Sequence, residues 1–193
     1  MQRPLLTLAW LLCVIYSTIP VFWLLIHPRA EYWRSRSQSP YKILLPLWIA
    51  MWILFASMSA PWRRVVLYQN RWTWLPAAFL FSAGLILYKL SHVHFTLQQL
   101  GGLPEIIPGH NQQLITTGIR SRLRHPIYLA HLCELFAWSL ASGLAVCWAL
   151  TAWALLTGAV MIKMEDRELE SRFGEEYRAY QSTVPAIIPK VKL

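Results

Sequence analysis

The fold is decided around residues 114–128, which read Leu-Ile-Thr-Thr-Gly-Ile-Arg-Ser-Arg-Leu-Arg-His-Pro-Ile-Tyr. This stretch is polar and basic, and an apolar run of 36 residues, 127–162, starts at its end. A second polar block, 163–180, begins where the apolar run stops. Because the run is long enough to cross a membrane and return, we expect the two polar blocks to meet at one membrane face. We predict the functional site at that meeting place.

The composition is that of a membrane protein, since 56% of the 193 residues are apolar and only 14% are charged. Apolar runs at 5–26, 43–60 and 73–90 approach the roughly 20 residues needed to cross a hydrocarbon core of about 30 Å. The run 127–162 is interrupted at Ser142-Gly143, which predicts two helices joined by a tight turn. We therefore predict an all-α membrane protein with about five transmembrane helices, the last two forming a hairpin. The first helix is expected to remain as an anchor and not to be cleaved as a signal peptide.

The net charge of +9 is distributed as the topology of a membrane protein requires. With the amino terminus outside, fourteen Lys and Arg residues fall in the inner segments and four in the outer ones. The positive-inside rule then places the amino terminus outside and the carboxyl terminus in the cytoplasm. We consequently expect no nucleic-acid partner. The three cysteines lie inside predicted spans without the spacing of a metal site or disulfide, so we expect core residues and no metal.

The His125-Pro126 pair marks the start of the fourth span. Proline is tolerated in the first turn of a helix, so Pro126 is expected to begin the helix and His125 to lie beside its free backbone N–H groups. The helix dipole, the hydroxyl of Tyr128 and three nearby arginines would favour an anionic or nucleotide-like ligand there. A basic cap at the membrane edge would give the same pattern.

Two adjacent acids, Glu165 and Asp166, follow the last span, where basic residues are usual. Neighbouring side chains diverge on a helix, so we expect one carboxylate to face the site and the other to face nearby charges. The rest of this block has apolar residues spaced as in an amphipathic helix that can lie on the membrane surface: Leu169, Phe173, Tyr177 and Tyr180.

In combination, these motifs resemble the isoprenylcysteine carboxyl methyltransferase and phospholipid N-methyltransferase family of membrane enzymes. The resemblance extends over roughly residues 112–190, and the first three helices match only as membrane spans. It rests on these residues: Leu114-Ile115-Thr116-Thr117-Gly118, Arg124-His125-Pro126, Tyr128, Glu165-Asp166, Phe173-Gly174-Glu175-Glu176-Tyr177, Tyr180, Val184-Pro185 and Ile188-Pro189.

The resemblance implies an enzyme that binds S-adenosylmethionine at the cytosolic face and methylates a carboxylate, amine or thiol on a lipophilic or small membrane-accessible acceptor. By motif position it implies these cofactor-binding residues: Leu114, Ile115, Gly118, His125, Pro126, Tyr128 and Glu165. Glu165 and Asp166 would close the cofactor site from the other side and act in catalysis. Arg120 and Asp166 replace the family's usual Tyr and Glu. Met161 replaces the Arg of the carboxyl methyltransferases, which points away from a prenylcysteine carboxylate.

His131 and Glu134 lie three residues apart inside the fourth span, on the side of the helix that carries Tyr128. Ionisable residues within a membrane usually mark a pathway or a site. We predict that this pair is catalytic and receives the polar end of the substrate. The alternative is an ion pair between the two residues that holds two helices together.

The predicted organisation is an amino-terminal part, residues 1–90, with three spans, followed by a methyltransferase core, residues 91–193, with a cytosolic cofactor loop, the hairpin 127–162 and a carboxyl-terminal helix. Two other functions remain open: an NADPH-dependent membrane reductase of the steroid-reductase type, and a non-catalytic membrane scaffold. The spacing from Thr-Thr-Gly to His-Pro-x-Tyr favours the methyltransferase. The expected location is a prokaryotic cell membrane, or the endoplasmic reticulum in a eukaryote.

Overall fold

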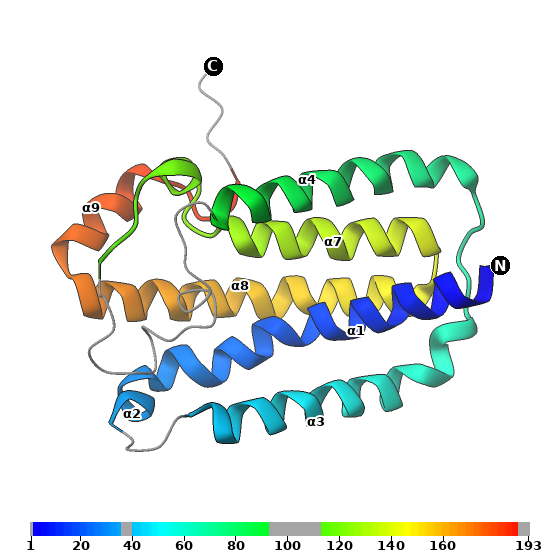
Figure 1. Ribbon diagram of the computed structural model, residues 1–193, viewed down its shortest axis with the longest axis horizontal. Coiled ribbons are helices and arrows are strands. Elements are labelled where there is room, and N and C mark those ends of the chain that lie inside the picture. The colour runs from blue at the N-terminus through cyan, green and yellow to red at the C-terminus, as the bar shows by residue number, and fades with distance from the viewer. Residues whose placement is uncertain (1, 36–39, 93–112, 189–193) are drawn as a thin grey trace.

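The computed structural model describes residues 2–35, 40–92 and 113–188, and over these residues the chain is a bundle of helices (Figure 1). The α-helices are α1 (Gln2–Ile26), α2 (Ala30–Arg34), α3 (Tyr41–Ser59), α4 (Trp74–His92), α7 (Pro126–Ser142), α8 (Ala145–Phe173) and α9 (Glu175–Thr183). Short 3₁₀ turns occur at η1 (His27–Arg29), η2 (Ala60–Arg64), η3 (Arg71–Thr73) and η4 (Gly118–Ser121). The all-α prediction is confirmed. Residues 93–112, which include most of the predicted cofactor loop, lie outside the described residues.

Four helical segments are long and apolar enough to cross a membrane: Arg3–Arg34, Tyr41–Arg64, Arg71–His92 and Ala145–Phe173. The fifth predicted span corresponds to α7, which has 17 residues. At 1.5 Å per residue it is about 26 Å long, slightly less than the hydrocarbon core. Its length is limited because Pro126 starts it and Gly143 ends it.

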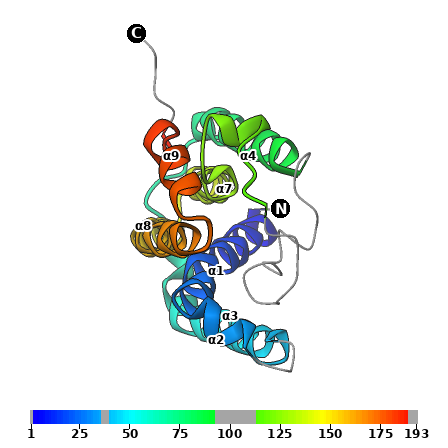
Figure 2. The same cartoon turned by 90° about the vertical axis from the view of Figure 1, so that its left-hand side faces the viewer.

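Both polar blocks lie at the same end of the bundle, as predicted. Figure 1 shows the amino terminus at one end of the long helices, and α2, α9 and the chain leading into α7 at the other. Figure 2 views the molecule from that second end, where α9 lies beside the start of α7 and the end of α8. The hairpin of α7 and α8 therefore carries the block before it and the block after it to a common place.

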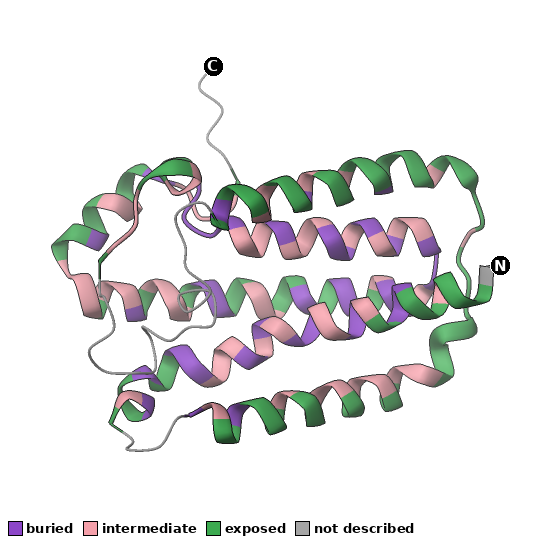
Figure 3. Cartoon of the chain, in the orientation of Figure 1, coloured by how far each residue is buried: buried purple, intermediate pink, exposed green. Residues whose placement is uncertain are grey.

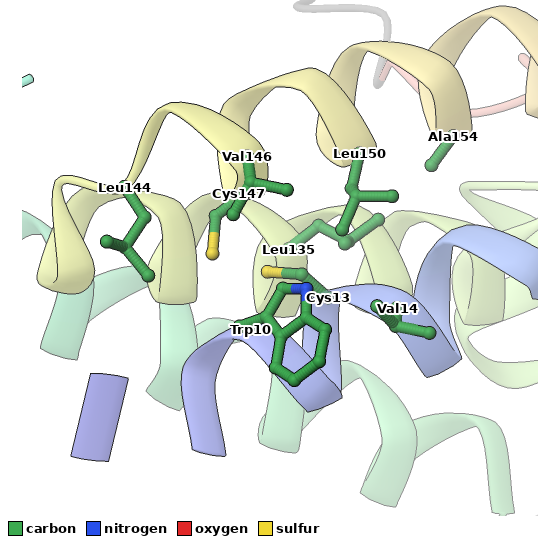
Figure 4. Close-up of a cluster of buried hydrophobic side chains, with 9 residues drawn as sticks. All are labelled: Trp10, Cys13, Val14, Leu135, Leu144, Val146, Cys147, Leu150 and Ala154. Atoms are coloured by element: carbon green, nitrogen blue, oxygen red, sulfur yellow. The ribbon is translucent and has the colours of Figure 1, made fainter. Parts of the chain in front are cut away.

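The interior forms where α1, α7 and α8 pack together. Figure 3 shows buried residues along these helices, whereas α3 and α4 carry many exposed positions. The main apolar cluster, drawn in Figure 4, consists of Trp10, Cys13, Val14, Leu135, Leu144, Val146, Cys147, Leu150 and Ala154. Cys13 and Cys147 are thus core residues, as predicted, and both are free thiols. Exposed apolar side chains on α3 and α4, such as Ile53 and Phe79, suit contact with lipid.

The turn between α7 and α8 depends on Gly143, which has a φ of +63°. A Cβ at this position would lie 2.2 Å from the carbonyl oxygen of Tyr68. The segment around Tyr68 is joined to the turn by backbone hydrogen bonds from Leu67 N to Gly143 O at 2.8 Å and from Ala145 N to Val65 O at 3.0 Å. Glycine is needed both for the left-handed conformation and for the close approach of Tyr68.

We expect Gly143→Ala to lower the thermal midpoint of the protein in detergent clearly, because the substitution adds left-handed strain of about 1–2 kcal/mol and a steric clash. The matched control is Gly158→Ala in the middle of α8, where the nearest atom to the new methyl group is Pro20 Cγ at 3.9 Å. That change should leave the midpoint unchanged or raise it, since alanine favours helix. Equal midpoints for the two variants would contradict this account of the turn.

Candidate functional site

The backbone around His125 is fixed by the carboxyl-terminal segment. Arg124 N donates to Pro185 O at 2.9 Å, and His125 N donates to Ala186 O at 3.0 Å. The Arg124 side chain continues this connection by donating to the carbonyl oxygens of Gln181 and Val184. These bonds satisfy N–H groups just before α7, where no helical partner exists, and hold residues 184–186 against the start of that helix.

The two acids lie within α8, about two turns before it ends at Phe173, and both contact His125 directly. Asp166 Oδ1 lies 2.9 Å from His125 Nε2, and Glu165 Oε2 lies 3.2 Å from His125 Nδ1. Asp166 also accepts from Arg124 Nη2 at 2.8 Å and from the hydroxyl of Tyr177. Both acids contact His125, and Asp166 also faces the charged group of Arg124; which of the two faces a ligand stays a prediction. The two nitrogens of an imidazole point away from each other. Two adjacent carboxylates that diverge on a helix can therefore each contact one nitrogen of the same ring.

Charge in this cluster, which we define as His125, Arg124, Glu165, Asp166 and Tyr177, is balanced. Burial opposes the charged form of His125, but the carboxylates outweigh it and raise the pKa of the imidazole from 6.5 to about 9. Burial and the hydrogen bond to Asp166 both raise the pKa of the Tyr177 hydroxyl above its usual range. The cluster therefore contains two cations and two anions at neutral pH, with His125 only 3% exposed.

The apolar side of α9 covers this cluster. Gly174, with a φ of +56°, separates α8 from α9 and reverses the chain toward residues 120–125. Tyr177 is 1% exposed, and the Tyr180 hydroxyl donates to Arg120 O at 2.7 Å. The predicted amphipathic helix is divided at Gly174, so that Leu169 and Phe173 belong to α8 and the two tyrosines to α9, where both pack within the protein. Contact of this segment with the membrane surface stays a prediction.

The remaining residues predicted to bind cofactor lie near this end of the bundle. Leu114 and Ile115 are half-buried on the segment that leads into η4, and Gly118 begins η4 with a φ of +62°. Pro126 is buried at the first position of α7. The ring of Tyr128, one turn on, lies 5.7 Å from that of His125.

His131 and Glu134 form no ion pair with each other in the part of the chain that the structure describes. The alternative of a paired His131 and Glu134 is therefore wrong. His131 instead packs among the rings of Tyr16, Tyr88 and Tyr128, at 5.5, 5.6 and 6.1 Å. Its Nδ1 has no hydrogen-bond partner among the described residues.

Glu134 lies at the contact between α7 and α4. It is 2% exposed, and its Oε1 has no hydrogen-bond partner within the described ranges. A Cβ on Gly84 of α4 would lie 2.7 Å from this oxygen, so the carboxylate occupies the space that the glycine leaves. A buried carboxylate oxygen without a hydrogen bond is unfavourable and is retained mainly at functional positions.

One further residue near the acids, His27 at the end of α1, was not predicted from the sequence. It is 4% exposed, and its Nε2 lies 3.9 Å from Glu165 Oε2. The loop that follows it is basic and aromatic, a composition typical of headgroup contact, so nothing in the spacing of residues indicates a role for this histidine. Only the packing of α1 against α8 brings it to the acids.

Comparison with known proteins identifies the family. Residues 72–176 match the family model of the phospholipid methyltransferases, which is more than half of the chain. The chain belongs to this family, and the resemblance inferred from the motifs is confirmed.

One relative and one negative result complete the comparison. The chain is 32% identical over 144 residues to the cobalt-zinc-cadmium resistance protein CzcN of Cupriavidus metallidurans. The match spans 68% of this chain and 63% of that protein, so the chain covers less than two thirds of the relative's length. No solved structure matches the chain.

The charge on His125 predicts a dependence of stability on pH. Below about pH 6.5 the folded and unfolded chains both carry the protonated ring, so its stabilisation is fully present. As pH rises toward about 9, only the folded chain holds the proton, and the stabilisation is lost as pH passes through that value. We expect the thermal midpoint in detergent to fall from pH 6.5 to pH 9.5.

His125→Gln should flatten this fall, since the variant has no proton to lose at this position. The control is His92→Gln, which changes an exposed residue at the end of α4 and should keep the wild-type pH dependence. A slope in the His125 variant as steep as in the wild type would contradict the assignment of the charge.

Proposed function

We propose that this chain is an S-adenosylmethionine-dependent methyltransferase of the membrane that acts on a lipophilic or small membrane-accessible acceptor. The observation that carries the proposal is the contact between the His125-Pro126 corner and the acids Glu165 and Asp166, two parts of the family pattern separated by the whole hairpin. Membership of the phospholipid methyltransferase family supports methyl transfer as the reaction class.

The two acids have different roles in this proposal. Asp166 is already bonded to His125, Arg124 and Tyr177, so it positions those side chains. Glu165 Oε2 is buried and pairs with His125 Nδ1 at 3.2 Å, which leaves part of its acceptor capacity unused. A carboxylate oxygen with remaining acceptor capacity fits a cationic ligand, so Glu165 is the acid that reaches the cofactor.

S-adenosylmethionine supplies, when bound, an activated methyl group on a positively charged sulfur. Glu165 would favour that charge and Tyr128 would hold the nucleoside by hydrogen bonding or stacking, while His125, whose two ring nitrogens both lie against the acids, would position Glu165. Leu114, Ile115 and Gly118 complete the nucleoside side, and Pro126 fixes the start of α7 beneath it. Positioning and exclusion of water supply most of the catalysis, because the methyl group needs no covalent enzyme intermediate.

The acceptor's polar end is received inside the bundle by His131 and Glu134. Both have a ring or carboxylate atom without a hydrogen bond among the described residues, and both lie on α7, the helix that begins at His125. The acceptor is a carboxylate, an amine or a thiol. An amine would lose a proton on methylation, and His131 or Glu134 could take it. In this proposal the end of the bundle that carries His125 lies in the cytoplasm, where the cofactor binds. The acceptor enters from the bilayer, between the helices.

Binding of S-adenosylhomocysteine to the purified protein in detergent, measured by calorimetry, tests the cofactor. We expect Glu165→Gln to weaken the binding of S-adenosylmethionine more than that of S-adenosylhomocysteine, because only the former carries a charged sulfur. Glu175→Gln is the control, since Glu175 is exposed on α9 and pairs with Arg178 at the surface. NADPH binding without binding of either sulfur nucleotide would favour the reductase, and no binding at all would favour the scaffold.

Transfer of labelled methyl groups to a membrane lipid and thiol extract tests the acceptor site. Glu134→Gln should reduce transfer by tenfold or more while S-adenosylhomocysteine binds as in the wild type, because the change removes charge at the acceptor side alone. The control is Ser139→Ala, which removes another buried polar group of α7, the Ser139 hydroxyl, and with it the hydrogen bond to Thr151. Undiminished transfer in the Glu134 variant would exclude Glu134 from the acceptor site.

A further inference from the structure

The imidazole ring of His27 is buried beside the end of α1. Its ring stacks on Trp23, with centroids 5.2 Å apart and planes 19° apart. Neither ring nitrogen has a hydrogen-bond partner among the residues that the structure describes. An imidazole buried in this way is unfavourable by the desolvation of its polar atoms unless something else binds them.

The segment that carries His27 is fixed to α8 near the acids. Arg34 Nη1 of α2 contacts Glu168 Oε1 at 3.2 Å, and Arg172 Nη2 contacts Glu168 Oε2 at 3.0 Å. Glu168 lies one turn beyond Glu165, so this buried bridge sets the distance between the end of α1 and the acids. The position of His27 is thus determined by the packing of two helices and not by a mobile loop.

His27 Nε2, which has no hydrogen bond among the described residues, faces Glu165 Oε2, which pairs with His125 Nδ1 and can still accept a further hydrogen bond. His27 Nε2 and Glu165 Oε2 are 3.9 Å apart, too far for a direct hydrogen bond. A single oxygen or nitrogen placed beside the line that joins them can lie about 2.8 Å from both. Because a carboxylate only accepts, the group that fills this place must donate, as a hydroxyl or an ammonium group does.

We propose that His27 and Glu165 together bind a hydrogen-bond donor of the nucleoside cofactor, which makes the end of α1 part of the cofactor site. The inference rests on the proposed function, since it takes the ligand of Glu165 to be that cofactor. S-adenosylmethionine carries both donor types, in its ribose hydroxyls and its amino group. His27 lies outside residues 72–176, so this contact is a contribution of the chain beyond the part that matches the family model.

The test compares His27→Phe with Trp33→Phe in calorimetric binding of S-adenosylhomocysteine to the full-length protein in detergent. His27→Phe keeps a flat ring for Trp23 but has no ring nitrogens. Trp33→Phe removes a partly buried hydrogen bond, from Trp33 Nε1 to Leu25 O at 2.9 Å. Trp33 belongs to an apolar cluster against which Trp23 packs, and it is not directed at Glu165. We expect about tenfold weaker binding in the first variant and wild-type binding in the second.

A second ligand distinguishes the two donors. 5′-Methylthioadenosine has the ribose hydroxyls but lacks the amino acid. Weaker binding of both ligands by His27→Phe supports a hydroxyl in this place, and weaker binding of S-adenosylhomocysteine alone supports the ammonium group.

His27→Asn, which is polar but too short to reach the same point, is a second variant in case the first does not fold, as judged by thermal unfolding. The same loss is expected. Wild-type affinity for both ligands in either folded variant overturns the inference and leaves the proposed function intact. Absence of binding by the wild-type protein would instead overturn the proposed function, and this inference with it.

Discussion

The imidazole of His125 lies between the carboxylates of Glu165 and Asp166, and the arrangement of this end of the molecule depends on that contact. It joins the first residue before α7 to the last part of α8, while Arg124 connects Asp166 to the backbone carbonyls of Gln181 and Val184. The two cations are buried, the two anions are partly buried, and each charge is compensated by an opposite one. Loss of one member would leave a buried charge without a partner, which is far more unfavourable than loss of the whole set.

The parts of the fold that follow from local chemistry could be predicted from the sequence. Pro126 and Gly143 mark the two ends of α7 because one has a fixed φ and the other adopts a positive φ. The meeting of the two polar blocks follows from counting spans. The direction of the side chains could not be predicted in the same way, since Glu165 and Asp166 both turn toward a ring that only tertiary packing places between them.

The apolar pattern of α9 and the pair on α7 show the same limit. Tyr177 and Tyr180 have the spacing of a lipid-facing stripe, but Gly174 reverses the chain so that they cover the protein. His131 and Glu134 have the spacing of an ion pair, yet each finds a different environment. Periodicity identifies which residues share a face, but the neighbour of that face is decided by the course of the chain beyond the helix.

The packing of α1 changes how the amino-terminal part should be regarded. By sequence this helix is only an apolar anchor, but in space it contacts both α7 and α8 and contributes Trp10, Cys13 and Val14 to the core they share. Because α1 packs along α7 and α8, the position of its last turn relative to those helices is fixed. His27, the residue after that turn, therefore lies beside Glu165. Because the membrane sets the length of every span, a helix that begins at the far face delivers the residues at its end to the level where the charged cluster lies. The anchor and the site are therefore parts of one packed unit.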